Sequence, residues 1–100
     1  MIHVRKVLPE YFEALRTGRK RFELRREEAE GPSFNVGDFL AVNEYDPKLE
    51  ALAECYTGRC LLFEILYVLR GHELQQPGTV ILSLSLRPLA PDDVAAIRPL

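Results

Sequence analysis

Apolar and polar residues alternate along much of this chain, which is the pattern of β-strands that bury one face. The clearest example covers residues 79–86, where the even-numbered positions are apolar and, apart from Ile81, the odd-numbered positions are polar. We expect further strands at residues 2–7 (a short edge strand), 20–25, 39–45 and 60–69. Periodicity alone does not separate the last of these from a buried helix, but its aromatic and β-branched residues and its flanking glycines favour a strand.

One amphipathic helix is expected at residues 9–17. Pro9 suits the first turn of a helix, where its missing N–H costs nothing. Phe12 and Leu15 share a face at helical spacing, and Gly18 is a natural place for the helix to end. We expect these two apolar side chains to pack on the core.

The remaining helix signals are weaker. Residues 48–56 could form one or two helical turns, and residues 91–97 could form a short C-terminal helix. With one main helix, several strands and no repeated βαβ unit, the pattern predicts an α+β domain whose mixed or antiparallel sheet curls into a small barrel. One hundred residues correspond to a single domain, residues 1–100.

The alternation also predicts which side chains form one common core. They are Phe12, Leu15, Phe22, Leu24, Leu40, Val42, Phe63, Ile65, Leu82 and Leu84.

Charge is distributed unevenly along the sequence, although the net charge is only −2. Residues 1–26 carry eight Lys or Arg and three Glu, whereas residues 27–100 carry five basic and twelve acidic residues. The basic N-terminal quarter could contact phosphates. Alternatively, the two parts could neutralise each other across the fold, and charge alone does not decide between these interpretations.

Several classes of protein are disfavoured by what the sequence lacks. No apolar run is long enough to span a membrane, and the N-terminus does not resemble a signal peptide, so we expect a cytoplasmic protein with no membrane partner. Cys55 and Cys60, with His3 and His72 far away in sequence, match no zinc-ligand spacing. We therefore expect no metal. The sequence also contains no glycine-rich phosphate loop, so we expect no cofactor.

Residues 20–25 contain the most informative local pattern. If Phe22 and Leu24 point inward, then Arg21, Glu23 and Arg25 point outward and place a carboxylate between two guanidinium groups. Such an arrangement is typical of a polar site, although a solvated charged strand face has the same pattern.

Five blocks of sequence resemble a known family. They are Leu8-Pro9-Glu10-Tyr11-Phe12-Glu13-Ala14, Gly18-x-Lys20-x-Phe22-Glu23-Leu24-Arg25, Val36-Gly37-Asp38, Glu44-Tyr45-Asp46-Pro47 and Tyr56-Thr57-Gly58-Arg59. In this order and spacing they closely resemble the DUF3850 family, which belongs to the ASCH superfamily. The resemblance implies a PUA-like β-barrel with a cleft between the first helix and the barrel wall. It also implies that residues 18–25 line this cleft and that the domain binds RNA.

The chain departs from that family in two places. The loop at residues 26–32 contains three glutamates, which is less favourable for phosphate binding nearby, and the insert at residues 49–54 is unusual. The roles of the acidic loop and of the insert are not evident from the sequence.

One branch of the same superfamily hydrolyses acylated cytidine nucleosides. This chain is similar to it at Gly18-Arg19-Lys20, where that branch uses its Lys in catalysis, but the position of its Thr nucleophile is occupied by Glu23. A carboxylate would form a mixed anhydride, so that mechanism is not implied for this chain. Lys20 and Glu23 could still act as a general acid–base pair if burial changed their proton affinities.

The resemblance and the residue types together give five candidate ligand-binding residues: Lys20, Glu23, Arg25, Tyr45 and Arg59. Lys20 could bind a phosphate or carbonyl, Glu23 a base edge, the two arginines a phosphate or base, and Tyr45 could stack on a base. The alternatives are a solvated strand start for the lysine, salt bridges among Glu23, Arg21, Arg25, Arg59 and Glu44, and a core position for the tyrosine.

We therefore expect a domain that binds RNA or a modified nucleotide. The first alternative is a small hydrolase acting on a nucleoside or nucleic acid, with Lys20 and Glu23 as candidate catalytic residues. The second is a protein-interaction module. The sequence does not indicate an oligomeric state.

Overall fold

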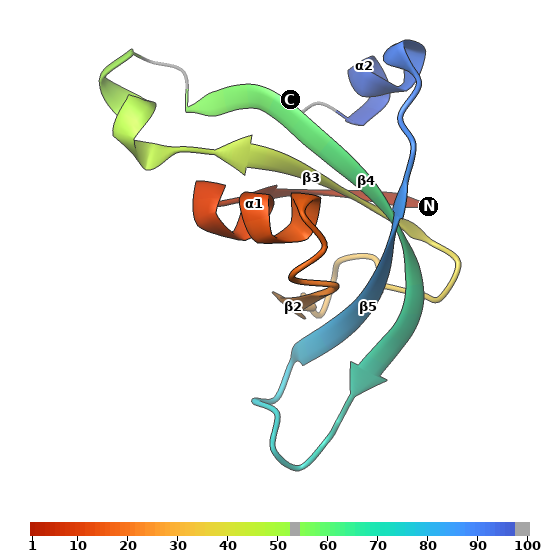
Figure 1. Ribbon diagram of the computed structural model, residues 1–100. Helices are drawn as coiled ribbons and strands as arrows, with labels where there is room; N and C mark the ends of the chain where they lie inside the picture. Colours follow the sequence, from red (N-terminus) through yellow and green to blue (C-terminus); the bar gives the residue numbers. More distant parts are fainter. Residues whose placement is uncertain (53–54, 98–100) are drawn as a thin grey trace.

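Five strands form a single curled sheet in the computed structural model, which describes residues 1–52 and 55–97. The strand order is β1-β3-β4-β5-β2, with β1 and β3 parallel and the other neighbours antiparallel. The elements are β1 (Ile2–Val7), α1 (Pro9–Arg16), β2 (Phe22–Arg26), β3 (Phe39–Tyr45), a 3₁₀ helix (Pro47–Leu52), β4 (Tyr56–Arg70), β5 (Thr79–Arg87), a second 3₁₀ helix (Pro91–Asp93) and α2 (Val94–Ile97). Figure 1 shows their arrangement. The predicted α+β class, mixed sheet and single main helix are confirmed.

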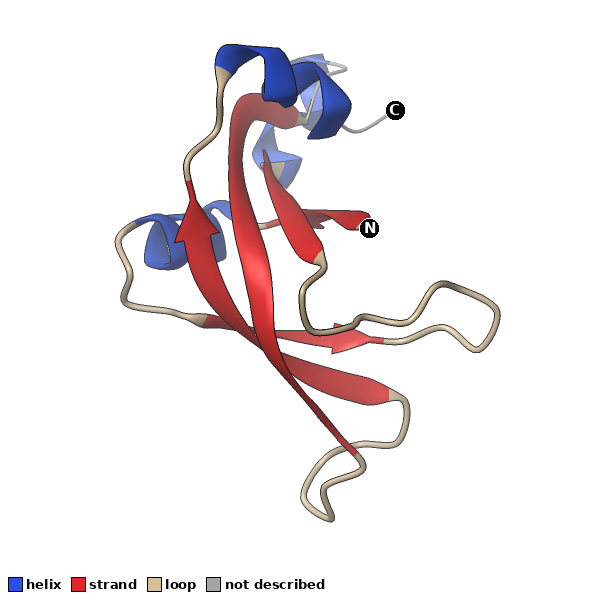
Figure 2. Cartoon of the chain, turned by 90° about the vertical axis from the view of Figure 1, so that its right-hand side faces the viewer, coloured by secondary structure: helices blue, strands red, loops and turns tan. Residues whose placement is uncertain are grey.

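The curl of the sheet comes from the long strand β4. Its N-terminal part pairs with β3, its C-terminal part pairs with β5, and residues 62–64 pair with both. An irregularity between Ile65 and Tyr67 shifts the register with β5, as a β-bulge does when it bends a strand. The strands therefore form a half-barrel, visible in Figure 2.

Helix α1 lies against the inner side of this half-barrel. It begins at Pro9, directly after the extended residue Leu8, and buries Phe12 and Leu15. Gly18, with a φ of +80°, follows the helix and lets the chain reverse without the strain that a side chain would add. The predicted helix at residues 9–17 is confirmed. Part of the predicted turn at residues 48–56 is the 3₁₀ helix Pro47–Leu52, and residues 53–54 lie outside the described part of the chain.

The core is confirmed for eight of the ten predicted side chains: Phe12, Leu15, Leu40, Val42, Phe63, Ile65, Leu82 and Leu84 are all buried. The same cluster also includes Val7, Phe34 and Val80. Of these, Phe34 lies in the segment between β2 and β3, outside every strand and helix, and was not among the predicted core side chains.

The predicted orientation of the strand over residues 20–25 is wrong. Phe22 and Leu24 are 50% and 58% exposed, whereas Glu23 is only 4% exposed. Residues directly opposite each other in an antiparallel pair share a face, and Glu23 is opposite the fully buried Leu82. The strand thus points its carboxylate inward, because cations on the same side neutralise it.

The C-terminal segment covers the opposite face of the sheet near β3. The buried side-chain amide of Asn43 donates a 2.9 Å hydrogen bond to the carbonyl of Ile97, whose side chain is buried. Figure 1 shows α2 on the far side of β3 and β4 from α1. The short helix predicted at residues 91–97 is therefore present, as a 3₁₀ turn followed by α2. None of the helices in the described residues is both long and apolar enough to cross a membrane.

Candidate ligand-binding site

Three of the predicted site residues form one ion-paired cluster. The carboxylate of Glu23 accepts a 2.6 Å hydrogen bond from Lys20 Nζ at Oε1 and a 2.9 Å bond from Arg25 Nε at Oε2. The side chain of Glu23 is 5% exposed, and those of Lys20 and Arg25 are 20% and 22% exposed. The cluster therefore carries one net positive charge at the boundary between the interior and solvent.

Arg25 also joins the two edges of the half-barrel. Strands β1 and β2 are the two ends of the sheet, and Arg25 Nη2 donates a 3.0 Å hydrogen bond to the main-chain carbonyl of Lys6 in β1. A side chain thus connects the edge strands where the sheet has no backbone ladder. Glu23 and Arg25 consequently stabilise the barrel as well as shaping the cluster.

Two half-exposed aromatic rings lie next to the ammonium group of Lys20. Its Nζ is 4.9 Å from the ring centroid of Tyr11 and 5.4 Å from that of Phe22. Tyr11 is 47% exposed and Phe22 is 50% exposed, so both rings remain accessible. The sequence analysis placed neither residue in the site, and it assigned Phe22 to the core. Tyr11 could have been selected because it lies in residues 8–14, one of the blocks that resemble the family.

Arg59 belongs to a second cluster that does not include Glu23. Arg59 Nη2 donates a 3.0 Å hydrogen bond to Glu13, its Nη1 lies 3.7 Å from Glu44, and its guanidinium carbon is 4.7 Å from the ring centroid of Phe12. Glu44 is buried and also accepts a 2.7 Å bond from the Thr57 hydroxyl. The salt bridge between Arg59 and Glu44, which was the alternative to a ligand-binding role for Arg59, is present, but α1 supplies the closer carboxylate. Arg59 therefore connects α1 to β3 and β4.

Glu13 is held in its ionised form by this second cluster. Arg16 Nε donates a 2.7 Å hydrogen bond to Glu13 Oε1. This bond is the largest cause, and the bond from Arg59 the second, of the lowering of the pKa of Glu13 from 4.5 to about 2. Because the folded-state pKa is below the unfolded value, the associated stability is fully present above pH 4.5 and is lost as the pH falls through about 2.

We expect the carboxyl carbon of Glu13 to titrate with a midpoint near 2 in an NMR titration of the folded protein. Arg16→Ala should raise this midpoint more than Arg59→Ala, because the hydrogen bond from Arg16 is the larger cause. A midpoint at the ordinary value of 4.5 in the wild-type protein would show that the cluster does not persist in solution.

Tyr45 is half-buried at the end of β3. Its ring contacts that of Tyr56 edge-to-face, with centroids 5.2 Å apart, and Lys6 Nζ lies 4.4 Å from the Tyr45 centroid. Lys6 is therefore the residue that connects Tyr45 with Arg25, through its side chain on one side and its carbonyl on the other.

The first glutamate of the acidic loop, Glu27, makes structural contacts. Glu27 accepts two 2.7 Å hydrogen bonds from Arg70 and one of 2.9 Å from the backbone N–H of Phe34. These bonds, chiefly those from Arg70, hold the pKa of Glu27 below its usual value. Glu27 thus holds the loop that inserts Phe34 into the core. One of the three glutamates of the acidic loop therefore has a structural role and is already neutralised by Arg70.

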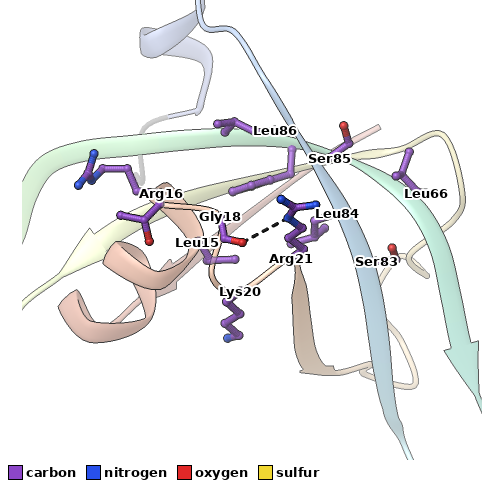
Figure 3. A pocket seen from close by; sticks show the side chains of 12 residues that line it. Leu15, Arg16, Gly18, Lys20, Arg21, Leu66, Ser83, Leu84, Ser85 and Leu86 are labelled. Atoms are coloured by element: carbon purple, nitrogen blue, oxygen red, sulfur yellow. Dashed lines mark hydrogen bonds between the residues drawn. The ribbon is translucent and has the colours of Figure 1, made fainter.

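A groove lies next to the first cluster, which is formed by Lys20, Glu23 and Arg25, and Lys20 lines it. It has a volume of about 620 Å³ and lies between the end of α1, the following turn and strands β4 and β5. Figure 3 shows that the Lys20 side chain is directed away from the other side chains that line it. Of the five predicted ligand-binding residues, Lys20 alone lines this groove. The expected cleft and the predicted polar cluster therefore share Lys20 but face different directions.

No metal site is formed by His, Cys, Asp and Glu side chains within residues 1–52 and 55–97. His3 is buried, and its Nε2 lies 2.9 Å from Asp38 Oδ2. Its ring also contacts Phe34, with centroids 4.5 Å apart. These contacts attach β1 to the loop that precedes β3, which is a structural role.

Comparison with known proteins supports the resemblance seen in the sequence. The model of the family described as a domain of unknown function, DUF3850, matches residues 2–84. This range includes the first polar cluster, the second polar cluster, Tyr45 and most of the sheet. No curated protein matches the chain. Because the match covers most of the sequence, the chain belongs to the DUF3850 family.

Proposed function

We propose that this domain is a PUA-like barrel of the ASCH superfamily that binds RNA or a modified nucleotide. The binding site consists of Lys20, Glu23 and Arg25 with the rings of Tyr11 and Phe22, and is called the Lys20 site below. The observation that carries the proposal is the Lys20 ammonium group, held 2.6 Å from a buried carboxylate and close to two half-exposed rings.

This combination suits the two chemical parts of a nucleotide. The site has a net positive charge, which favours a phosphate, and Lys20 is more exposed than the glutamate that holds it. The accessible faces of Tyr11 and Phe22 can stack on bases, which requires no particular sequence. The resemblance to ASCH domains supports the same ligand class.

Glu23 acts in this proposal as a positioning residue. Both of its oxygens already accept hydrogen bonds from cations, and it is almost fully buried. It therefore fixes the directions of Lys20 and Arg25, and ligand contacts fall mainly to the lysine. Arg59 is already engaged by Glu13 and Glu44, so we expect it to contribute less than Lys20.

The same contacts disfavour hydrolysis as the leading function. A carboxylate whose two oxygens are each paired with a cation, Lys20 and Arg25, is a weakened nucleophile, because the cations stabilise its negative charge. We accordingly propose that acylated cytidine is not turned over by this protein.

We expect Lys20→Ala to weaken binding of mixed-sequence single-stranded RNA by roughly tenfold, the effect of losing one charge-assisted hydrogen bond. Binding by the wild-type protein should weaken linearly on a logarithmic salt scale, because cations near phosphates release counterions. Fluorescence anisotropy over a salt series measures both effects.

Lys48→Ala is the matched control, because Lys48 is an exposed lysine beyond the end of β3 that lies outside the Lys20 site. It should leave affinity within about twofold of wild type. Equal losses of RNA affinity in Lys20→Ala and Lys48→Ala would show that only the overall charge matters and would contradict a specific role for Lys20. No binding of either RNA or nucleotides at low salt would reject the proposed function.

A further inference from the structure

Among the described residues, strand β5 has an unpaired edge beyond the point where β2 begins. The pairing of β2 with β5 begins at Phe22 opposite Ser83, and the bond from the Leu84 N–H to the Arg21 carbonyl, 2.9 Å long, extends it by one step. The chain on the β2 side then turns back onto α1, with a 3.0 Å bond from the Lys20 N–H to the Ala14 carbonyl. Strand β5 itself continues to Arg87, paired with β4 on its other side only.

The direction of the backbone groups follows from the bonds on either side. The N–H of Leu84 points towards β2, and the N–H and C=O of its partner Ile65 bond to Asp38 and Gly37, away from β5. Backbone groups alternate sides along an antiparallel strand. Leu86 therefore directs both its N–H and its C=O to the unpaired side, together with the C=O of Leu84.

The side chains beside this edge form the groove described above. Leu86 and Leu66 are 51% and 47% exposed, and both line it. Figure 3 shows them with Arg21, whose Nε donates a 3.2 Å hydrogen bond to the carbonyl of Gly18. Within the described part of the chain, no carboxylate forms an ion pair with Arg21.

We propose that this groove binds an extended peptide, which adds as a strand to the edge of β5 and places a carboxylate against Arg21. The strand edge supplies main-chain hydrogen bonds, and the exposed leucines supply apolar contacts for alternate side chains of the peptide. The carboxylate is either an acidic side chain or the C-terminus of the peptide, because both complement the guanidinium group.

A peptide fits the groove better than a nucleic acid strand does. Of the cations that line the groove, Arg16 is neutralised by Glu13, and Lys20 is held by Glu23 on the other side of the turn. One unneutralised guanidinium is little charge for a phosphate backbone, whereas it matches a single carboxylate. The proposal is therefore independent of RNA binding at the Lys20 site.

The test is a selection from a synthetic library of random octapeptides with free C-termini, repeated with an amidated library. We expect enrichment of extended, β-forming sequences with an acidic residue, or with a required free C-terminus if the terminal carboxylate is the group bound. Enriched peptides should shift the amide signals of Ser85 and Leu86 in ¹⁵N-correlated NMR spectra. No enrichment in either library would overturn the proposal.

Two changes separate this binding mode from adventitious contact. Arg21→Ala should weaken an enriched peptide by about tenfold, whereas Arg19→Ala, an exposed arginine that does not line the groove, should leave its affinity within about twofold of wild type. N-methylation of single peptide residues should weaken binding by about fivefold at alternate positions, since only alternate N–H groups face β5.

Equal effects of the two arginine substitutions, or indifference to N-methylation, would overturn strand addition at this edge. Peptide shifts confined to the signals of other strands would do the same. Because N-methylation leaves the protein unchanged, this arm does not depend on how a variant folds.

Discussion

Glu23→Ala is expected to lower the free energy of unfolding by about 2–3 kcal/mol, because it leaves two partly buried cations without their shared counterion. The substitution also removes the acceptor that orients Arg25 towards the carbonyl of Lys6, so the connection between β1 and β2 is weakened as well. Urea unfolding followed by circular dichroism at neutral pH measures the difference.

Leu24→Ala on the same strand is the matched control. Its side chain is 58% exposed, so removing it should cost only about 0.5 kcal/mol. The expected order, a large loss for the charged residue and a small one for the leucine, is opposite to what simple alternation predicts. A larger loss for Leu24→Ala would mean that β2 faces the other way in solution.

Phe34→Ala is expected to cost about 3–4 kcal/mol, the range for emptying a buried aromatic site. Phe34 is 1% exposed, and its ring meets that of His3 and lies 5.2 Å from the guanidinium carbon of Arg5. Its backbone N–H donates a hydrogen bond to Glu27, so both the side chain and the backbone of Phe34 attach this loop to the rest of the protein.

Val36→Ala serves as the control within the same loop, since Val36 is 63% exposed and should cost less than about 0.5 kcal/mol. The two variants are compared by their urea midpoints. Similar, small losses in both would contradict the role assigned to this loop.

The sequence predicts the strands and the main helix well because their signals are local. Alternation over residues 79–86 and helical spacing between Phe12 and Leu15 depend only on neighbours in the chain, and the structure confirms both. Alternation divides a strand into two faces but does not say which one is inside. For β2 the polar face is inside, because Lys20 and Arg25 neutralise Glu23 there.

Contacts between distant residues account for what sequence reasoning missed. Arg59 and Glu13 are separated by 46 positions, so nothing local indicates that α1 provides the carboxylate closest to Arg59. Phe34 is in a charged, proline-containing segment, and its burial depends on Arg70, which lies 43 positions from Glu27. The Lys20 cluster was partly predictable, because its three members lie within six residues of one another.

The proposed function is tested most directly by mapping where RNA binds. ¹⁵N-correlated NMR spectra of the wild-type protein and of Lys20→Ala would be recorded during titration with a mixed-sequence single-stranded RNA and, separately, with nucleoside monophosphates at low ionic strength. The proposal predicts saturable shifts of the amides of Tyr11, Lys20, Phe22 and Glu23 that are strongly reduced in the variant. The absence of saturable shifts with every ligand, or shifts that leave these four amides unchanged, would contradict RNA or nucleotide binding at the Lys20 site.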